Sequence, residues 1–271
     1  MLFRSVALFA QDPASKIVLA KGQKIMVTTT VAISSSNMGM NADVNSRNEN
    51  MLEVKQVTDK ESTITSTLTK MKMDVDAPGN STSYDSEKKE DQETEMGKSM
   101  SEKLNKATDI TVDNTTGAVV NAPKAAQKKD GDNASPGMDM LSMLGDSGSD
   151  DVVVSGAFQV IPKGKKPGDS WLDSTIDKDT KVRRTYNFKS NADSGAVIQL
   201  VTTIESSGTI EMMGMNLEMN TTTETTSNIL LDAATGLVKK RSTEANVSGS
   251  MSVMGQSIPI SAKATTISVY K

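Results

Sequence analysis

The sequence contains no cysteine and no histidine, and only eight of its 271 residues are aromatic. A chain without cysteine and histidine has no disulfide, no Cys/His zinc site and no iron–sulfur cluster. It has no histidine base for a serine or cysteine nucleophile, and no cysteine to carry a lipoprotein-type anchor. These absences exclude several enzyme classes and metal centres before any pattern is considered.

The sequence also has no excess of positive charge. Thirty Lys and Arg face 34 Asp and Glu, so the formal net charge is −4 and the pI is about 5.1. Nucleic-acid binding needs a basic surface, often with aromatic rings that stack on bases, but Lys and Arg form no basic stripe along this chain and aromatic residues are few. No nucleic-acid partner is therefore expected. No run approaches the roughly 18–20 apolar residues of a membrane-spanning helix, which predicts a soluble protein with no transmembrane segment.

Methionine offsets the shortage of large apolar residues, with 18 copies. Residues two apart in a strand share a face, so Met-x-Met pairs are typical of a packed sheet face. Thioethers also bind Cu(I), and a Met-rich Cu(I)-binding periplasmic protein is therefore an alternative interpretation. The pairs are Met38/Met40, Met71/Met73, Met138/Met140, Met213/Met215 and Met251/Met254.

The N-terminus has the order of a secretory signal. Arg4 precedes an apolar run, and Ala10 stands before the polar residues that follow. The run is short for the apolar region of such a signal, so we interpret residues 1–10 as a truncated signal segment. An exported, periplasmic protein is expected.

Ser and Thr alternate with β-branched residues and Met along most of the chain. This two-residue period is typical of antiparallel strands with one solvated face. We therefore predict a mainly β fold, in which long antiparallel meander strands form curved sheets or a half-barrel. Two β segments are expected, at 20–122 and 152–271, as two domains or as one continuous sheet.

One or two short helices are expected between the halves. Met96, Met100 and Leu104 recur at helical spacing, which predicts an amphipathic helix near 90–107. Residues 123–151 are rich in Pro, Gly, Ser, Asp and Lys and are interpreted as a mobile linker.

Two turns share one pattern. Ile110-x-x-Asp113-x-x-Thr116-Gly117-x-Val119 matches Ile229-x-x-Asp232-x-x-Thr235-Gly236-x-Val238 position for position. Asp opens such a turn and Gly supplies a positive φ, so both convergence and an ancestral duplication explain the match. The residues expected to shape structural turns are Asp113, Thr116, Gly117, Asp232, Thr235, Gly236, Gly168 and Asp169.

Gly168-Asp169-Ser170 looks like the nucleophile block of GDS-type esterases, whose serine needs a histidine. The chain has none, so we interpret the block as a turn that leads into Trp171. Asp and Glu are plentiful, which leaves a carboxylate-pair hydrolase as an open alternative. The expectation is a protein that is not an enzyme, with no catalytic, cofactor-binding or metal-ligating residue and no cofactor.

Several motifs mark strand starts and turns: Lys21-Gly22-Gln23, Pro167-Gly168-Asp169-Ser170-Trp171, Leu231-Asp232-x-x-Thr235-Gly236 and Met254-Gly255. Together with the export signal, they resemble a functionally uncharacterised family of exported bacterial β-rich proteins over most of residues 20–270. The resemblance implies a curved antiparallel sheet, no established activity and no functional residues to carry over. In architecture alone, the chain is similar to the half-barrel lipoprotein carriers of the Gram-negative periplasm, which hold acyl chains in an apolar concavity.

The leading hypothesis is a non-enzymatic exported protein that binds an apolar ligand, such as a lipid, or a cell-envelope partner in a sheet concavity. A structural protein with no ligand is a further alternative. The ligand, the biological process and the oligomeric state are not set by the sequence. The candidate lining residues are Met213, Met215, Met219, Met251, Met254 and Trp171.

Overall fold

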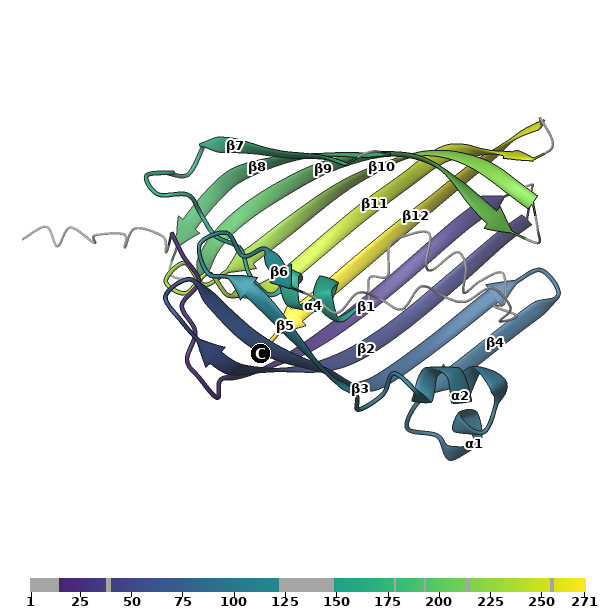
Figure 1. Cartoon of the computed structure of the whole chain (residues 1–271), viewed down its shortest axis with the longest axis horizontal. Coiled ribbons are helices and arrows are strands. Elements are labelled where there is room, and N and C mark those ends of the chain that lie inside the picture. The colour runs from purple at the N-terminus through teal and green to yellow at the C-terminus, as the bar shows by residue number, and fades with distance from the viewer. Residues whose placement is uncertain are drawn as a thin grey trace, which may run out of the picture.

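The described part of the fold is one twelve-stranded antiparallel sheet with three short helices (Figure 1). The structure is a computed structural model that describes residues 15–37, 40–121, 149–177, 179–192, 194–212, 215–253 and 256–271. The expected signal segment and nearly all of the expected linker lie outside these ranges. The prediction of long antiparallel meander strands in a curved sheet is confirmed.

Most strands pair with their neighbours in sequence, and the sheet order is β6-β5-β3-β2-β1-β12-β11-β10-β9-β8-β7, with β4 on β3. The first and last long strands pair in the middle, so strands of both expected β segments belong to one continuous sheet. The strands are β1 (Lys24–Asn37), β2 (Met40–Val57), β3 (Glu61–Ala77), β4 (Asn80–Asp85), β5 (Ala107–Asp113), β6 (Val119–Asn121), β7 (Ser170–Asp177), β8 (Thr180–Ala192), β9 (Gly195–Met212), β10 (Met215–Leu231), β11 (Val238–Val253) and β12 (Gln256–Tyr270).

Two short helices, α1 (Lys89–Gln92) and α2 (Glu95–Ser101), replace the single helix expected near 90–107. The break falls at Thr94, whose backbone is extended and whose Oγ1 accepts the N–H of Gly97 at 2.9 Å. This side-chain cap starts a new helix, and β5 already begins at Ala107. The helical spacing therefore located helical structure but not its interruption.

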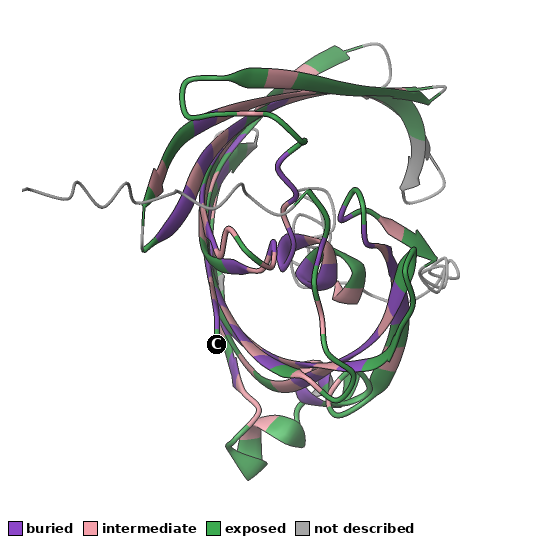
Figure 2. Cartoon of the chain, turned by 90° about the vertical axis from the view of Figure 1, so that its left-hand side faces the viewer, coloured by how far each residue is buried: buried purple, intermediate pink, exposed green. Residues whose placement is uncertain are grey.

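Alternate residues of each long strand face opposite sides of the sheet, and one side is buried. In β2, the even-numbered residues from Val44 to Val54 are all buried, while their odd-numbered neighbours are exposed or half-buried. The sheet curves around this buried side, which we call the concave face (Figure 2). The opposite side is the outer face.

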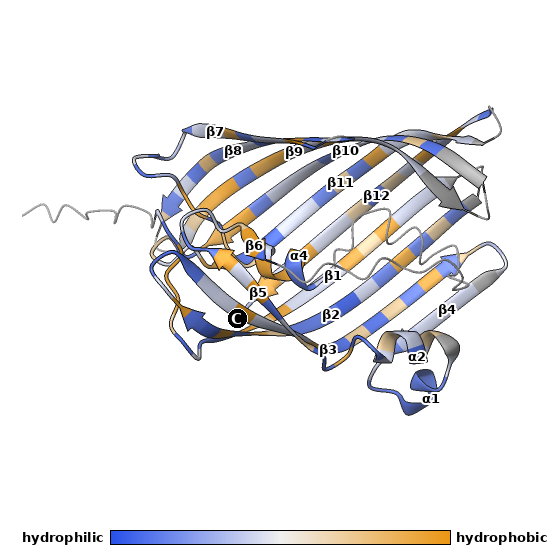
Figure 3. Cartoon of the chain, viewed as in Figure 1, coloured by the Kyte–Doolittle hydropathy of each residue, from blue (hydrophilic) through white to orange (hydrophobic). Residues whose placement is uncertain are grey.

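One end of the curve is filled by residues 149–161, which we call the plug segment. It contains α4 (Asp150–Gly156), so the expected boundary at 151/152 falls inside a helix. Val153, Val154 and Phe158 share one core cluster with residues of β1, β2, β3, β5 and β8–β12. Figure 2 shows α4 inside the curve, and Figure 3 shows hydrophobic residues gathered at this end. We call it the closed end, and the end with the β9–β10 and β11–β12 hairpins the open end.

The plug segment joins the two halves of the chain. The Ser66 hydroxyl of β3 donates to the Asp150 carboxylate at 2.6 Å, and Phe158 forms a β-bridge with Leu237 beside β11. The N–H of Gln159 donates to the carbonyl of Gly236 at 2.9 Å. The segment thus runs from the N-terminal strands to the C-terminal strands across the concave face.

Candidate functional site

The concave face of six neighbouring strands, from β9 through β12 and β1 to β2, has almost no charge. Next to them, Arg184 of β8 and Asp173 of β7 are on the same face and form an ion pair at 3.2 Å. Antiparallel register shows which residues share this face, because directly paired residues point to the same side. Across six neighbouring strands, the one charged side chain described on it is Arg241. The concave-face residues are every second one of Ala196–Gly208 in β9, Met219–Leu231 in β10, Arg241–Met251 in β11, Ile258–Tyr270 in β12, Ile25–Ser35 in β1 and Ala42–Val54 in β2.

The outer face of these same strands carries the charge. Both signs are interspersed along it, as expected of a solvated surface. The two faces therefore differ in chemistry rather than only in exposure. The outer-face charges are Lys24, Asp43, Arg47, Glu49, Glu53, Glu205, Glu218, Glu224, Lys240, Glu244 and Lys263.

Toward the open end, the concave face of β9–β12 is half-buried and mixes hydroxyl with apolar side chains. Thr223, Val247 and Ala262 form one row across β10, β11 and β12, and Ile204 extends it on β9. Ala262 is buried, and the other three are partly exposed. This surface offers apolar contact without the dense packing of the closed end.

Some of the candidate methionines lie among the described residues, and others do not. Met219 on β10 pairs directly with Met251 on β11, so these two lie side by side on the concave face. Met251 is buried and Met219 is half-buried. Met215 is the first residue of β10, whereas Met213 and Met254 lie outside the described residues.

The structure does not bring Trp171 to this methionine pair. Trp171 lies on β7 and stacks on Tyr186 of β8, with ring centroids 5.1 Å apart and planes 3° apart. Strand pairing connects Trp171 through Tyr186 and Leu200 to Ser227 of β10. Ser227 is eight residues along β10 from Met219, a distance of about 27 Å. Both rings pack against the closed-end core, and burial raises the pKa of Tyr186.

Arg241 lies where the packed core ends. On one side it pairs with the buried Ile229, and on the other with Ser268. The residue is half-buried, but its Nε is enclosed and has no hydrogen-bond partner. None of the ion pairs among the described residues includes Arg241. Burial lowers the pKa of Arg241, and the nearby Tyr270 and Tyr186 hydroxyls act in the opposite direction.

Polar residues continue from Arg241 across three more strands. Arg241 pairs with Ser268, Ser268 with Thr29, and Thr29 with Asn48. We call these four residues the polar row. The Ser268 and Thr29 hydroxyls are hydrogen-bonded at 3.1 Å, but Oδ1 of Asn48 has no partner. Both side-chain polar atoms of the adjacent Asn50 also lack one.

The two matching turns lie together at the closed end. In each, the Asp carboxylate accepts hydrogen bonds from the backbone N–H groups two and three residues later, at 2.7 and 2.9 Å for Asp113 and 3.0 Å for Asp232. Thr116 and Thr235 donate their hydroxyls to the same carboxylates, and hydrogen bonds to the turn lower the pKa of Asp113. The pKa of Asp232 is also lowered, with burial opposing its turn hydrogen bonds.

Both turns contact the same short N-terminal stretch. The N–H of Ile17 donates to the carbonyl of Asn114 in one turn, and that of Val18 to the carbonyl of Thr235 in the other. Gly117 and Gly236 have φ values of 77° and 74°. The turns are therefore architectural parts of the closed end.

Gly168 and Asp169 form a turn before β7. The Asp169 carboxylate accepts the N–H of Lys166 at 2.9 Å, and the N–H of Gly168 donates to the carbonyl of Phe188 at 2.7 Å. Ser170, which follows, donates its hydroxyl to the side chain of Asn187. This geometry anchors the start of β7.

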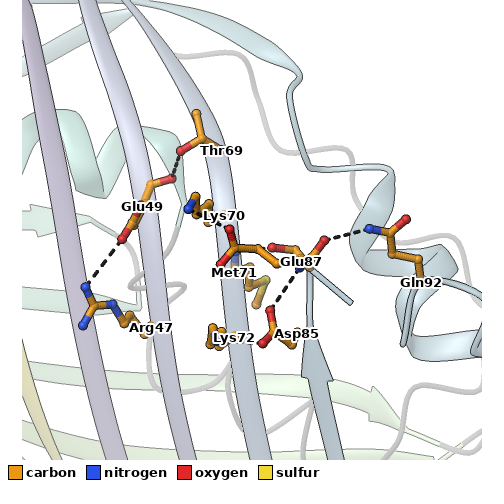
Figure 4. Close-up of polar contacts among 10 residues, drawn as sticks. Arg47, Glu49, Thr69, Lys70, Met71, Lys72, Asp85, Glu87 and Gln92 are labelled. Atoms are coloured by element: carbon orange, nitrogen blue, oxygen red, sulfur yellow. Dashed lines mark hydrogen bonds and ion pairs between the residues drawn. The ribbon is translucent and has the colours of Figure 1, made fainter. Parts of the chain in front are cut away.

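Two hollows, of about 470 and 310 Å³, lie on the outer face and are polar. The smaller one is near β2–β4, and Figure 4 shows the polar contacts among side chains that line it and their neighbours. Lys70 pairs with Glu87 and Lys72 with Asp85, each at 2.7 Å, so the charges there are matched. Hydrogen bonds to these carboxylates raise the pKa of both lysines. A balanced, solvated network is no strong candidate for a ligand site.

Within the described ranges, no three Asp or Glu side chains gather as a metal site would require. In the same part of the chain, none of the helices has the length and apolar character of a membrane span.

Residues 59–238 match a family described as a family of unknown function, DUF6263. The chain belongs to this family. The resemblance to a functionally uncharacterised β-rich family is thereby confirmed. No curated protein matches the sequence.

Among solved structures, lipovitellin matches with a TM-score of 0.51 and 12% identity, in a structure that concerns lipid–protein interactions. The match covers 93% of this chain but only 25% of the lipovitellin chain, so the two share a fold over about a quarter of the larger protein. An outer membrane channel from Pseudomonas putida F1 matches with a TM-score of 0.34 and 10% identity, over 96% of this chain and 99% of that one. A score this low establishes no shared fold.

Sequence reasoning about this DUF6263 protein missed Arg241 and the polar row. The chain offered one signal, because Arg241 has the strand parity of Ala245 and Val247 rather than that of Lys240 and Glu244. Its odd position in the strand alternation therefore indicated that this arginine is on the opposite face from its charged neighbours. The unpaired state of Asn48 and Asn50 depends on the fold and left no trace in the sequence.

Proposed function

We propose that this DUF6263 protein binds a ligand with a long apolar part, of the lipid class, on the concave face toward the open end. The observation that carries the proposal is the absence of charge, apart from Arg241, from the concave face of β9, β10, β11, β12, β1 and β2. Apolar and hydroxyl side chains contact acyl chains without the cost of burying a charge. The proposed role is binding rather than catalysis, in an exported protein.

The shared fold with lipovitellin supports the same proposal, since that structure concerns lipid–protein interactions. The partial exposure of Ile204, Thr223 and Val247 supports it further, because a face already packed by protein would offer no contact area. Ligand sites are commonly concave and largely apolar, with few polar groups that orient the ligand.

The proposal is tested with matched substitutions at adjacent positions of β11. Val247 faces the concave side and Ser248 the outer side. In delipidated full-length protein, Val247→Asp should weaken binding of a fluorescent long-chain probe by about tenfold or more, because it places a charge under the apolar chain. Ser248→Asp should leave affinity within about twofold of the wild type.

A second variant separates loss of binding from loss of folding. Val247→Trp keeps the face apolar but fills part of it, and should also weaken the probe while circular dichroism shows an intact sheet. If wild type binds no long-chain probe, or if the two aspartate variants bind equally, the concave face is not the site and the proposal is wrong.

A further inference from the structure

Arg241 is an unusual residue for its position. Arginine is rarely buried without a partner, because the desolvation of an unpaired charge costs several kcal/mol. Its Nε is enclosed, and no ion pair in the described part of the chain includes it. It lies at the boundary between the closed-end core and the half-exposed concave face.

Other polar side chains on the same face also have buried atoms without hydrogen-bond partners. Among the described residues, five buried side-chain atoms have no hydrogen-bond partner, and four of them belong to Arg241, Asn48 and Asn50. Asn48 is 6% exposed and Asn50 1% exposed. Buried polar groups without partners are few in native proteins, and their occurrence along one face of neighbouring strands calls for a physical explanation.

We propose that Arg241 is the anchor for the anionic head group of an amphiphile whose apolar tail lies along the concave face toward the open end. This inference rests on the proposed function and adds the class of ligand. Guanidinium groups present several N–H donors in a planar fork that matches carboxylate and phosphate oxygens. A head group at Arg241 has the packed closed end behind it, so the tail is directed toward Thr243, Val247 and Met251.

The polar row fits the part of the ligand next to the charge. Ser268 and Thr29 provide hydroxyls, and Asn48 provides an unpaired amide oxygen. The adjacent Asn50 adds an unpaired amide donor and acceptor. With strands about 4.8 Å apart, the row spans about 14 Å from Arg241 to Asn48. This span exceeds a single carboxylate and suits a head group with further hydrogen-bonding atoms.

The test compares three ligands with the same chain length: palmitate, hexadecyl phosphate and hexadecanol. Each competes with a fluorescent long-chain probe for delipidated full-length protein. Wild type should bind the two anions about tenfold or more tightly than the neutral alcohol. Arg241→Met should reduce this preference to within about twofold, with hexadecanol affinity unchanged, and Arg241→Lys should lie between them.

The matched control is Arg183→Met, which removes an exposed arginine from the outer face of β8 and should retain the wild-type preference. The melting temperature of Arg241→Met should not fall, because the substitution removes a half-buried charge that has no ion-pair partner. A lower melting temperature with unchanged ligand preference would show a merely structural arginine and overturn the inference.

Two further arms locate the source of the anion and separate the two proposals. Acetate and inorganic phosphate, each without a tail, should not displace the probe at millimolar concentration. Displacement by inorganic phosphate alone would point to a free-anion site and overturn the amphiphile. Equal binding of all three long-chain ligands would reject the role of Arg241 and keep the proposed function, whereas no binding of any of them would reject both.

Discussion

The closed and open ends of the sheet differ in how the concave face is packed. At the closed end, strands from both halves meet the plug segment in one cluster of buried apolar residues that includes Phe158, Ile198 and Ile229. Toward the open end, the same strands of the C-terminal half present half-buried Thr, Ala and Val on their concave face. Strand pairing continues through both ends, so only the packing on the concave face changes.

This contrast shows that one part of a strand can stabilise the fold while another part of the same strand provides a binding surface. The closed end gains from burial of large side chains, at roughly 25 cal/mol per Å² of apolar surface. Toward the open end, less apolar surface is buried, and the side chains that stay partly exposed form a surface that a ligand can contact. Substitutions in the two regions should therefore differ in size and in kind.

The largest expected effect is at the plug segment. Phe158→Ala should lower the free energy of unfolding by about 3–5 kcal/mol, because the ring is 3% exposed and its loss leaves a cavity in a core shared by both halves. Met251→Ala, near the open end, should cost only about 2 kcal/mol, since Met251 belongs to neither buried cluster and its surroundings can relax. Urea titration measures both.

Equal losses for the two variants would contradict the division of the sheet. Phe158→Leu serves as the control for volume, and should recover more than half of the loss because it keeps most of the apolar contact. The slope of the titration should be the same for all three variants if the native fold is retained.

A smaller effect is expected at the turn that supports the plug segment. Gly236 has a φ of 74°, and a Cβ there would lie 3.3 Å from the carbonyl oxygen of Gln159. Gly236→Ala should therefore cost about 1–3 kcal/mol, from backbone strain and this contact together. Gly168 also has a positive φ, of 100°, but its Cβ would meet open space, so Gly168→Ala should cost about 1 kcal/mol. If Gly168→Ala is the more damaging, contact with the plug segment is not what matters at Gly236.

The strands could be predicted from the sequence because the pattern that indicates them involves residues close together in the chain. Alternation of apolar and polar residues, as in Ile25, Val27 and Val31 of β1, is set by strand geometry alone. The two Asp-x-x-Thr-Gly turns were readable for the same reason, since their hydrogen bonds join residues two to four apart. The Asp113 and Asp232 turns accordingly have the same backbone geometry.

The plug segment was not predictable because its conformation depends on distant contacts. Val152, Val153 and Val154 are β-branched and were expected to open a β segment, yet they form α4. Asp150 and Asp151 favour the start of a helix, and burial of Val153 and Val154 against the core decides the outcome over local propensity. The candidate face was likewise located only in part, with Met219 and Met251 paired but Trp171 at the other end.

The smallest expected effect concerns acid stability at the closed end. The pKa values of Asp113 and Asp232 are lowered in the folded protein by hydrogen bonds within their turns, so each carboxylate adds stability above the unfolded pKa of about 4. This contribution is lost as the pH falls through the lower, folded pKa. Asp113→Asn with Asp232→Asn should thus cost a little stability at pH 7, because Asn still accepts turn hydrogen bonds, and should converge on wild type as the pH falls through the folded pKa values.

Urea midpoints across pH 3–7 measure this convergence, and Asp43→Asn on the outer face controls for the loss of a negative charge. If the double variant loses as much stability at the lowest pH as at pH 7, the carboxylate charge is not what holds the turns. If it converges as expected, the closed end contains a charge-dependent contribution that the uncharged concave face toward the open end lacks. Acid should then loosen the anchoring of the plug segment before it affects the strands of the open end.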